Sequence, residues 1–178
     1  MALNQPQPGT PFPSIPVQLR SGQSISLGTP AQGADWRLVV IYRGKHCPLC
    51  TRYLNQLETL KADLAEIGVD IIAASMDSQA QLEAHLEALD VSFPIAYGLT
   101  IAQAQSLGLY LSEPRSAQET DHVFAEPGLF VINAEGKIQI ADYSNIPFAR
   151  PDLKTLVAGL QWLRTPENNY PVRGTYQG

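Results

Sequence analysis

Residues 38–50 of the chain read LVVIYRGKHCPLC and contain both of its cysteines. The first five residues of this stretch are apolar and rich in β-branched side chains, which is typical of a strand buried on both faces. Leucines then recur at three- and four-residue steps, as on one face of an amphipathic helix, and Gly68 supplies a stop. We therefore expect a strand that leads into a helix over about residues 48–67, with the two cysteines at the junction.

Toward the C-terminus, strand-like apolar runs alternate with helical spacings. The predicted elements are a strand over 69–74, a helix capped at Asp77-Ser78, a strand over 91–95, a short helix from Thr100 to Leu107, a β-hairpin over 129–140 and a last helix from Pro151. Strands and helices in this order favour a parallel core, and the hairpin adds antiparallel strands. We therefore predict an α/β fold in which helices flank a central mixed sheet.

The segments outside this core are expected to be less regular. The first 34 residues hold one charged side chain, Arg20, and six of the 14 prolines, and the turn Ser21-Gly22 separates two short strand-like runs. This pattern predicts an N-terminal extended arm over 1–34 that ends in a small hairpin. Residues 112–126 are polar and aperiodic, which predicts a mobile loop, and the tail over 165–178 is expected to be irregular. We expect the 178 residues to form one domain.

The composition argues against several classes of protein. The formal net charge is −5 and the basic residues form no cluster that could neutralise a phosphate backbone, so we expect no nucleic-acid partner. The first residues, MALNQP, lack the basic start and the apolar stretch of a secretory signal, and no window approaches about 18 consecutive apolar residues. We therefore expect a soluble, cytoplasmic protein without a membrane partner.

A Cys-x-x-Cys pair in a reducing cytosol indicates redox or metal chemistry rather than a structural staple. Cys47 is expected at the start of a helix, where unpaired N–H groups and a partial positive charge stabilise a thiolate. Arg43, Lys45 and His46 add positive or ionisable groups beside it. We therefore expect Cys47 to be exposed, with a pKa below the free value of about 8.5, and Cys50 to be less exposed.

The spacing of the two cysteines suits a local disulfide. Residues at i and i+3 in the first helical turn approach to about 5 to 6 Å between Cα atoms, the usual separation across a bridge. Pro48 fits this turn, because the nitrogen of the first helical residue has no helical partner. We therefore expect Cys50 to attack Cys47 once that sulfur is oxidised, without any cofactor.

Metal and haem binding fit the sequence less well. A zinc site needs two further ligands, and the remaining histidines are His46, His85 and His122, of which the last two lack ligand-like spacing. Covalent haem attachment needs a histidine directly after the second cysteine, where this chain has Thr51. We expect no metal, and we expect His85 and His122 to be structural or solvated residues.

Nearly the whole chain resembles the peroxiredoxin-like branch of the alkyl hydroperoxide reductase and thiol-specific antioxidant (AhpC/TSA) family, within the thioredoxin-like superfamily. The segments that carry the resemblance are GTPFP at 9–13, YRGKHCPLC at 42–50, EPGLFVIN at 126–133 and GKI at 136–138. The resemblance implies a thioredoxin-like fold. It also gives Pro127 the role of a proline that is often cis and faces the active cysteines, where it presents bare backbone groups to a substrate.

The chain departs from the family pattern at three positions. Typical peroxiredoxins have Thr or Ser three residues before the attacking cysteine and Pro seven before it, where this chain has Gly44 and Val40. The arginine that usually precedes the later strand is replaced by Pro127. These groups orient the peroxide and stabilise charge on the leaving oxygen. Arg43 and Arg150 are the candidates to take over these roles.

Three functions are open from the sequence. The first is peroxide reduction, in which the Cys47 thiolate becomes a sulfenic acid, Cys50 closes a disulfide, and an external thiol of thioredoxin or glutathione type reopens it. The second is exchange with protein or small disulfides through a mixed disulfide. The third is a non-catalytic redox sensor, in which the dithiol changes the conformation of residues 112–126 for a partner. The whole-chain resemblance favours the first and the departures favour the second; we expect peroxide reduction, and a homodimer is compatible with the sequence.

Overall fold

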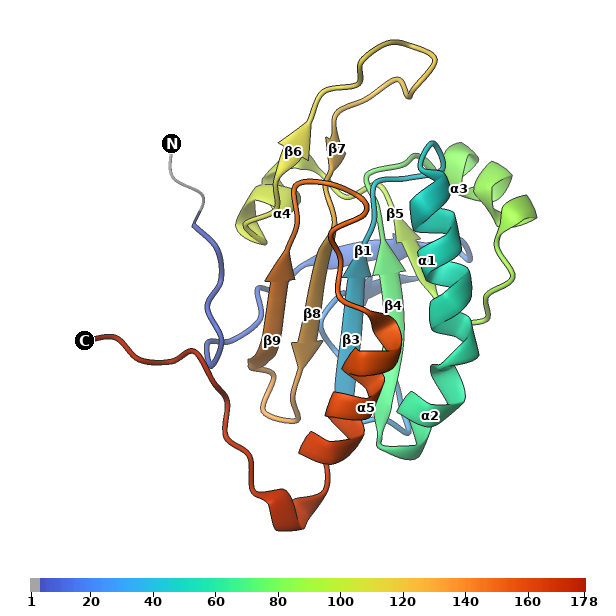
Figure 1. Cartoon of the computed structure of the whole chain (residues 1–178). Coiled ribbons are helices and arrows are strands. Elements are labelled where there is room, and N and C mark those ends of the chain that lie inside the picture. The colour runs from blue at the N-terminus through green and yellow to red at the C-terminus, as the bar shows by residue number, and fades with distance from the viewer. Residues whose placement is uncertain (1–3) are drawn as a thin grey trace.

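A seven-stranded mixed sheet forms the centre of the computed structural model, which describes residues 4–178 (Figure 1). In spatial order its strands are β2 (Ser24–Ser26), β1 (Pro16–Leu19), β5 (Ile95–Tyr97), β4 (Val69–Ala74), β3 (Trp36–Ile41), β8 (Gly128–Ile132) and β9 (Ile138–Tyr143). The strands β3, β4 and β5 run parallel, whereas β1, β2, β8 and β9 pair with their neighbours antiparallel. The predicted α/β class with a mixed central sheet is confirmed.

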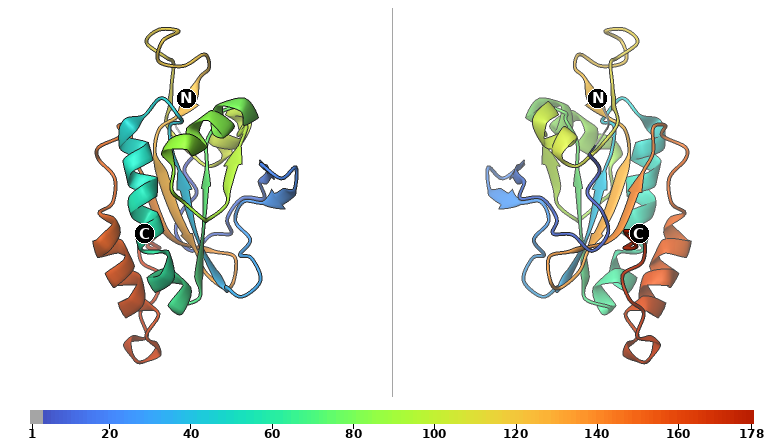
Figure 2. Two further views of the ribbon diagram at one scale, coloured as in Figure 1. Left: turned by 90° about the vertical axis from the view of Figure 1, so that its right-hand side faces the viewer. Right: turned by 90° about the vertical axis from the view of Figure 1, so that its left-hand side faces the viewer.

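Two apolar cores lie on opposite faces of this sheet, because successive side chains of a strand point to opposite sides. Leu38 and Val40 of β3 belong to the first core, and Val39 and Ile41 belong to the second. The first core lies under the helices α1 (Pro48–Thr59), α2 (Lys61–Glu66) and α5 (Leu153–Leu163), and the second lies under the N-terminal segment and α4 (Ile101–Ser106) (Figure 2). All six residues of β3 are buried, as predicted for the apolar run that starts at Leu38, and the buried Arg37 pairs with Asp70 at 2.7 Å.

The helix expected over 48–67 is two helices that meet at Leu60. The backbone of Leu60 leaves helical geometry (φ −105°, ψ 0°), and its amide bonds to the carbonyl of Leu57, three residues back. The hydroxyl of Thr59 meanwhile donates to the carbonyl of Gln56, a local bond that competes with the regular helical pattern. The apolar spacing was right about the buried face, but it did not indicate this break.

Two boundaries of the second half also differ from the sequence prediction. The strand expected over 91–95 begins only at Ile95, because the amide of Ser92 bonds to the side chain of Glu58 at 3.0 Å instead of joining a strand. The last helix begins two residues later than expected. Asp152 is its N-cap and accepts the amide of Thr155 at 2.9 Å.

The predicted N-terminal hairpin is present and belongs to the main sheet. Val17 of β1 lies opposite Ile25 of β2, and Gln18 of β1 also lies opposite Tyr97 of β5. The first three residues of the predicted arm lie outside the described residues. The tail after α5 contains one short 3-10 turn, Pro166–Asn168, and is otherwise irregular, as expected.

The segment predicted as a polar loop over 112–126 begins and ends in a small second sheet. It consists of β6 (Leu111–Ser112) and β7 (Phe124–Ala125), which pair antiparallel, and the chain between them projects beyond the edge of the main sheet (Figure 1). Phe124 explains the pairing, because its side chain is fully buried although the surrounding sequence is polar. We call residues 111–126 the β6–β7 segment below.

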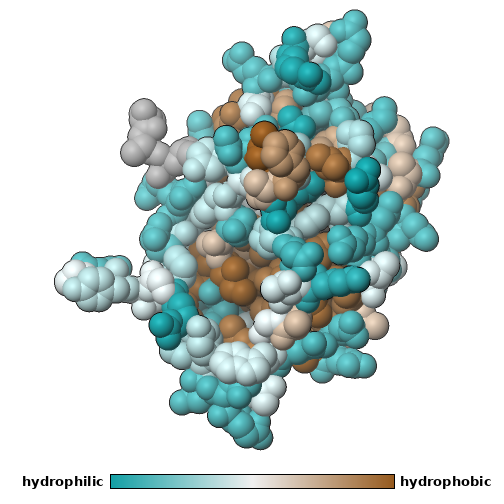
Figure 3. All heavy atoms as spheres, in the orientation of Figure 1, coloured by the Kyte–Doolittle hydropathy of each residue, from teal (hydrophilic) through white to brown (hydrophobic). Residues whose placement is uncertain are grey.

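The surface over α1, α5 and β9 is mostly hydrophilic, with apolar patches over the β9–α5 connection and over β8 and β9 (Figure 3). Phe148 in the β9–α5 connection keeps 73% of its exposure. Two more helical elements, α3 (Gln79–His85) and a 3-10 turn over Leu86–Ala88, lead from β4 toward β5. Among residues 4–178, no helix has the length and apolar character needed to cross a membrane.

Candidate active site

Cys47 is the N-cap residue of α1, and Cys50 lies in the first turn of this helix. The backbone of Cys47 is extended (φ −108°, ψ 101°), and its Sγ accepts a hydrogen bond from the amide of Cys50 at 3.3 Å. Pro48 occupies the first turn, where its missing N–H removes no helical bond. The strand-to-helix junction predicted from residues 38–50 therefore places the Cys47 sulfur at the end of the helix where N–H groups are free.

Both cysteines are buried, so the expectation of an exposed Cys47 was wrong. Cys47 keeps 2% of its exposure and Cys50 keeps none, and both are free thiols. They belong to the apolar core beneath α1, together with Tyr42 and Leu54. The capping hydrogen bond turns the Cys47 side chain back over the first helical turn and toward this core, which the sequence pattern does not reveal.

The surroundings of Cys47 favour its thiolate. The hydrogen bond with the Cys50 thiol, assisted by the Cys50 amide and by Arg43, lowers the pKa of Cys47 to about 6 against the opposing effect of burial. The same interaction with Cys47, together with burial, raises the pKa of Cys50. At neutral pH Cys47 therefore carries the negative charge and Cys50 carries the proton.

Arg43 reaches Cys47 while held by the β6–β7 segment. Its Nε lies 3.1 Å from Oε2 of Glu126 and one of its terminal nitrogens lies 3.8 Å from Glu119, while its guanidinium stacks on Phe124 at 4.7 Å from the ring centroid. Glu126 is itself buried and accepts the hydroxyl of Ser112 at 2.7 Å. Residues from two distant parts of the chain thus fix one cation beside the Cys47 thiol.

The two other basic neighbours of Cys47 contribute differently. Burial lowers the pKa of His46, so its imidazole is neutral at pH 7, and the ring lies edge to face against Phe124 at 4.6 Å between centroids. Lys45 donates its backbone amide to Oδ2 of Asp77 at 2.8 Å. Of the three groups expected to lower the pKa of Cys47, Arg43 is the one that interacts with its thiol.

Asp77 anchors the loop between β3 and α1. Its side chain is 1% exposed, and besides binding the Lys45 amide it lies 3.2 Å from Nε2 of His122 in the β6–β7 segment. Gly44 makes this approach possible, since a Cβ at that position would lie 2.5 Å from Oδ1 of Asp77. The glycine that replaces the family's Thr or Ser therefore has a steric reason in this chain.

Arg150 lies beside the second cysteine rather than the first. Its Nη1 donates to the Sγ of Cys50 at 3.4 Å, and its guanidinium lies 4.3 Å from the ring centroid of Tyr53. The Tyr53 hydroxyl donates to the carbonyl of Pro151 at 2.7 Å, which holds the ring in place. The two candidate arginines are thus divided between the thiols, with Arg43 at Cys47 and Arg150 at Cys50.

Pro127 joins β7 to β8 through a trans peptide bond, so the expected cis proline is wrong for this chain. The residue before it, Glu126, donates its amide to Tyr110, and the Pro127 carbonyl accepts the amide of Ser144. Both bonds continue extended pairing without the tight bend that a cis bond would provide. Pro127 lines a small void with Tyr53 and Arg150, on the face of the sheet that α1 covers.

The histidines on α3 and in the β6–β7 segment make structural contacts, in line with expectation. Nε2 of His85 lies 2.7 Å from the hydroxyl of Thr51 on α1, and burial lowers the pKa of His85. Nδ1 of His122 lies 2.7 Å from the carbonyl of Val123, and its Nε2 lies 3.2 Å from Oδ1 of Asp77. Both rings therefore join elements that surround the cysteines.

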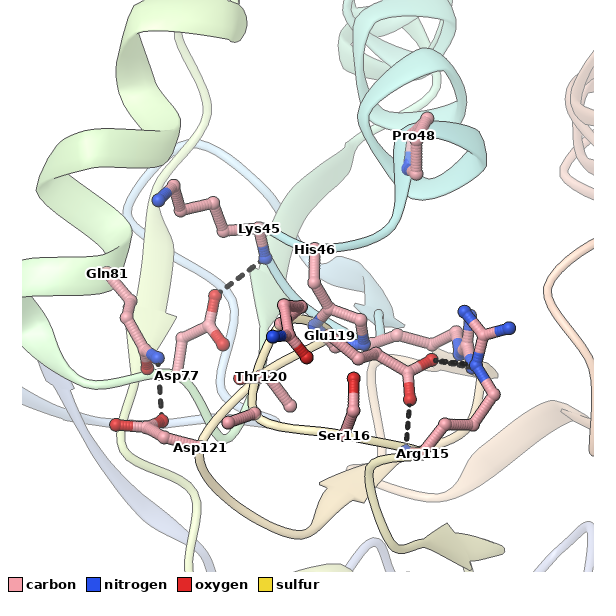
Figure 4. A pocket seen from close by; sticks show the side chains of 13 residues that line it. Lys45, His46, Pro48, Asp77, Gln81, Arg115, Ser116, Glu119, Thr120 and Asp121 are labelled. Atoms are coloured by element: carbon pink, nitrogen blue, oxygen red, sulfur yellow. Dashed lines mark hydrogen bonds and ion pairs between the residues drawn. The ribbon is translucent and has the colours of Figure 1, made fainter.

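A cavity of about 670 Å³ opens beside the neighbours of Cys47 (Figure 4). It lies between the loop after β3, the start of α3 and the β6–β7 segment, and its lining residues are Arg43, Lys45, His46, Pro48, Asp77, Gln81 and residues 115–121. Its lining carries several charged side chains: Arg115 pairs with Glu119 within the β6–β7 segment, and Asp121 accepts a hydrogen bond from the side-chain amide of Gln81 on α3. The cavity is therefore polar, and it is larger than hydrogen peroxide requires.

Sequence reasoning did not single out Asp77 or Glu126 as site residues. Each is a carboxylate that is more than nine-tenths buried, and burial of an acid is rare unless a partner compensates it. Asp77 was placed as a helix cap and Glu126 as the end of a loop, because burial is not visible in the sequence. The nearest sequence signal was the position of Asp77 just after a predicted parallel strand.

The model of the AhpC/TSA family matches residues 8–141. No match is found among curated protein sequences. Similar solved structures include peroxiredoxin 6 of Arenicola marina, with 19% identity and a TM-score of 0.72 over 90% of this chain and 74% of the other. A peroxiredoxin-like protein from Aquifex aeolicus is 16% identical, with a TM-score of 0.72 over 90% of this chain and 89% of the other. The 2-Cys peroxiredoxin of Plasmodium vivax is 14% identical, with a TM-score of 0.73 over 96% and 89%.

Proposed function

The chain belongs to the AhpC/TSA family and is a thiol oxidoreductase of the peroxiredoxin type, and we propose that it reduces peroxides with Cys47 as the attacking thiolate and Cys50 as the resolving thiol. The observation that carries this proposal is that Cys47 combines a lowered pKa with 2% exposure. A small peroxide needs little room to reach such a sulfur. A protein disulfide needs the loop between β3 and α1 to move first.

In the first step, the Cys47 thiolate attacks one oxygen of the peroxide and the O–O bond breaks. The attacked oxygen stays on sulfur as a sulfenic acid, and the other leaves with the bonding electron pair and takes a proton from water or from the Cys50 thiol. Arg43 supports this step, because a fixed cation beside the sulfur stabilises both the thiolate and the charge that develops on the leaving oxygen. Arg43 thus takes the role of the family's usual arginine, which this chain replaces with Pro127.

In the second step, the Cys50 thiolate attacks the Cys47 sulfur, a disulfide forms and hydroxide leaves as water. The position of Cys50 one helical turn after Cys47 supports this closure, since its amide already bonds to the Cys47 sulfur at 3.3 Å. An external thiol of thioredoxin or glutathione type then reduces the disulfide in two exchange steps and is itself oxidised. We expect no metal or organic cofactor to take part.

The roles of the flanking residues follow from the same contacts. Gly44 admits the carboxylate of Asp77, which holds the Lys45 amide and so fixes the loop before Cys47. His46 and Pro48 line the cavity through which a substrate would approach. Pro127 packs near Arg150 and supports the Cys50 side of the site.

The test is a comparison of two reactions of the same reduced protein. Consumption of hydrogen peroxide and of a small organic hydroperoxide is measured beside reduction of insulin disulfides, with Cys47→Ser as the inactive control. We expect peroxide consumption that depends on Cys47 and exceeds insulin reduction at equal enzyme concentration. Insulin reduction without peroxide turnover would reject peroxide as the substrate in favour of disulfide exchange, and the absence of both reactions would favour a non-catalytic redox sensor.

A further inference from the structure

Arg150 is the one cation in contact with the Cys50 sulfur among residues 4–178. Its Nη1 lies 3.4 Å from Sγ, and the plane of its guanidinium is fixed against the ring of Tyr53 at 4.3 Å. Within the described residues 4–178, no carboxylate lies within ion-pair distance of Arg150, whereas Arg43 is paired with Glu126 and Glu119. The positive charge of Arg150 is therefore available to the sulfur.

Cys50 needs such a partner more than Cys47 does. Cys50 is completely buried, and burial disfavours the charged thiolate relative to the neutral thiol. In the reduced protein, the neighbouring Cys47 thiolate and burial both raise the pKa of Cys50, and Arg150 opposes them. Once Cys47 is a neutral sulfenic acid, it no longer raises the pKa of Cys50 through a negative charge. The pKa of Cys50 is then set by burial, which raises it, and by Arg150, which lowers it.

We infer that Arg150 holds the negative charge on the Cys50 sulfur each time the Cys47–Cys50 disulfide forms or breaks. This inference rests on the proposed function and adds to it a catalytic residue that contacts a reacting atom. It also separates the two arginines by step, because Arg43 acts on the oxidation of Cys47 and Arg150 acts on the disulfide.

Electron pairs and protons move in opposite directions when the Cys47–Cys50 disulfide forms and when it breaks. When the disulfide forms, the Cys50 thiol first loses its proton, and the resulting thiolate donates its electron pair to the Cys47 sulfur. The hydroxyl of the sulfenic acid leaves with the S–O electron pair and takes up a proton to become water. When it breaks, the thiolate of an external reductant attacks the Cys47 sulfur and the S–S electron pair returns to Cys50. A second reductant thiol then releases Cys47 as a thiolate. Arg150 stabilises the Cys50 thiolate in both directions, and after the disulfide breaks water protonates this thiolate.

The experiment separates three rates in Arg150→Met and in the wild type. The first rate is the consumption of one equivalent of hydrogen peroxide. The second is the closure of the disulfide, which is measured as the loss of the sulfenic acid that dimedone can trap. The third is the reduction of the preformed disulfide by dithiothreitol. A hydrogen bond to a charged group accounts for about ten- to a hundredfold in rate. We expect closure and reduction to slow by about tenfold or more, with the first rate unchanged.

Two further variants make the result specific. Arg52→Met removes an exposed arginine of α1, the helix that carries Cys50. Arg52 lines the groove beside Arg150, and its replacement should leave all three rates as in the wild type. Arg150→Lys keeps a cation and should recover part of the closure rate, which a purely structural role would not predict. If Arg150→Met does not fold, Arg150→Gln carries the same three measurements.

The measurements distinguish a failure of the proposed function from a failure of the role inferred for Arg150. Wild-type protein that consumes peroxide without forming a Cys47–Cys50 disulfide would reject the proposed resolving role and this inference with it. Wild-type protein that forms the disulfide, together with Arg150→Met that closes and reduces it at wild-type rates, would overturn the inference and leave the proposed function intact. An equal loss in all three rates would also overturn it, since Arg150 would then act on the fold or on Cys47.

Discussion

The carboxylate of Asp77 occupies the place in which a side chain of residue 44 would lie. A Cβ built on Gly44 would be 2.5 Å from Oδ1 of Asp77, and the backbone there has φ +142°, a conformation that L side chains rarely adopt. From this position Asp77 binds the amide of Lys45 at 2.8 Å. The buried carboxylate of Asp77 therefore holds the loop that leads to Cys47, and it fits there because Gly44 has no side chain.

Gly44→Ala is expected to destabilise the protein. The added methyl group would collide with a carboxylate that is tied to a backbone amide, and strain of this kind costs about 1 to 3 kcal/mol of unfolding free energy. Denaturant unfolding followed by circular dichroism measures the loss. Gly136→Ala is the matched control, because Gly136 also has a positive φ but nothing within 4 Å of a Cβ. Equal losses in the two variants would contradict a specific clash with Asp77.

Asp77→Ala is expected to release the loop before Cys47. The Lys45 amide and His122 would both lose a buried partner, at a cost of about 1 to 3 kcal/mol. Hydrogen exchange read out by mass spectrometry should show faster exchange in peptides covering residues 43–47 and the β6–β7 segment. Asp121→Ala is the control, since Asp121 is exposed and contacts Gln81 at the cavity rim. Unchanged protection of residues 43–47 in Asp77→Ala would show that Asp77 does not hold this loop.

The thiolate of Cys47 should form well below the pH at which a free cysteine ionises. Alkylation by iodoacetamide follows the thiolate, so its rate should rise with pH through a midpoint near 6, the pKa lowered by the Cys50 hydrogen bond and by Arg43. Cys50→Ser leaves one thiol to be alkylated and keeps a hydroxyl donor beside it. A midpoint at about 8.5 or above in this variant would contradict the role of Cys47 as the nucleophile.

Replacement of Arg43 should raise that midpoint. Loss of a charged hydrogen-bond donor is expected to move the Cys47 pKa upward by about one to two pH units in Arg43→Met, which shifts the alkylation curve to higher pH. Because the change also leaves Glu126 without its cation, Arg43→Met combined with Glu126→Gln serves as the control for a buried unpaired acid. A midpoint that returns to the wild-type value in the double variant would mean that Arg43 acts through Glu126 and not on the thiol.

Much of the fold was predictable because apolar spacing reports burial. The continuous apolar run before Tyr42 indicated a strand covered on both faces, and the strand-to-helix junction at Cys47 followed from the leucine spacing after it. The break at Leu60 was not predictable in the same way, because both helices keep their apolar face toward the same core. The pattern specifies which side is buried and leaves the continuity of the backbone open.

The site was predictable only where its residues are neighbours in sequence. Cys47, Cys50 and Arg43 lie within one short segment, whereas Arg150 follows Cys50 by 100 residues and contacts its sulfur through the folding of the β9–α5 connection. The cis proline was expected from resemblance alone. The trans bond at Pro127 instead follows from the extended pairing of Glu126 and of the Pro127 carbonyl on either side of it.

Cys47 should be oxidised first and Cys50 should then resolve it, and peptide mass spectrometry after one equivalent of hydrogen peroxide tests this order. Cys50→Ser with dimedone present should carry a dimedone adduct on Cys47, and the wild type without dimedone should form a Cys47–Cys50 disulfide. Cys47→Ser should give neither product. An adduct on Cys50 in Cys47→Ser, formed as fast as the Cys47 adduct in Cys50→Ser or faster, would contradict the assignment of Cys47 as the attacking thiol.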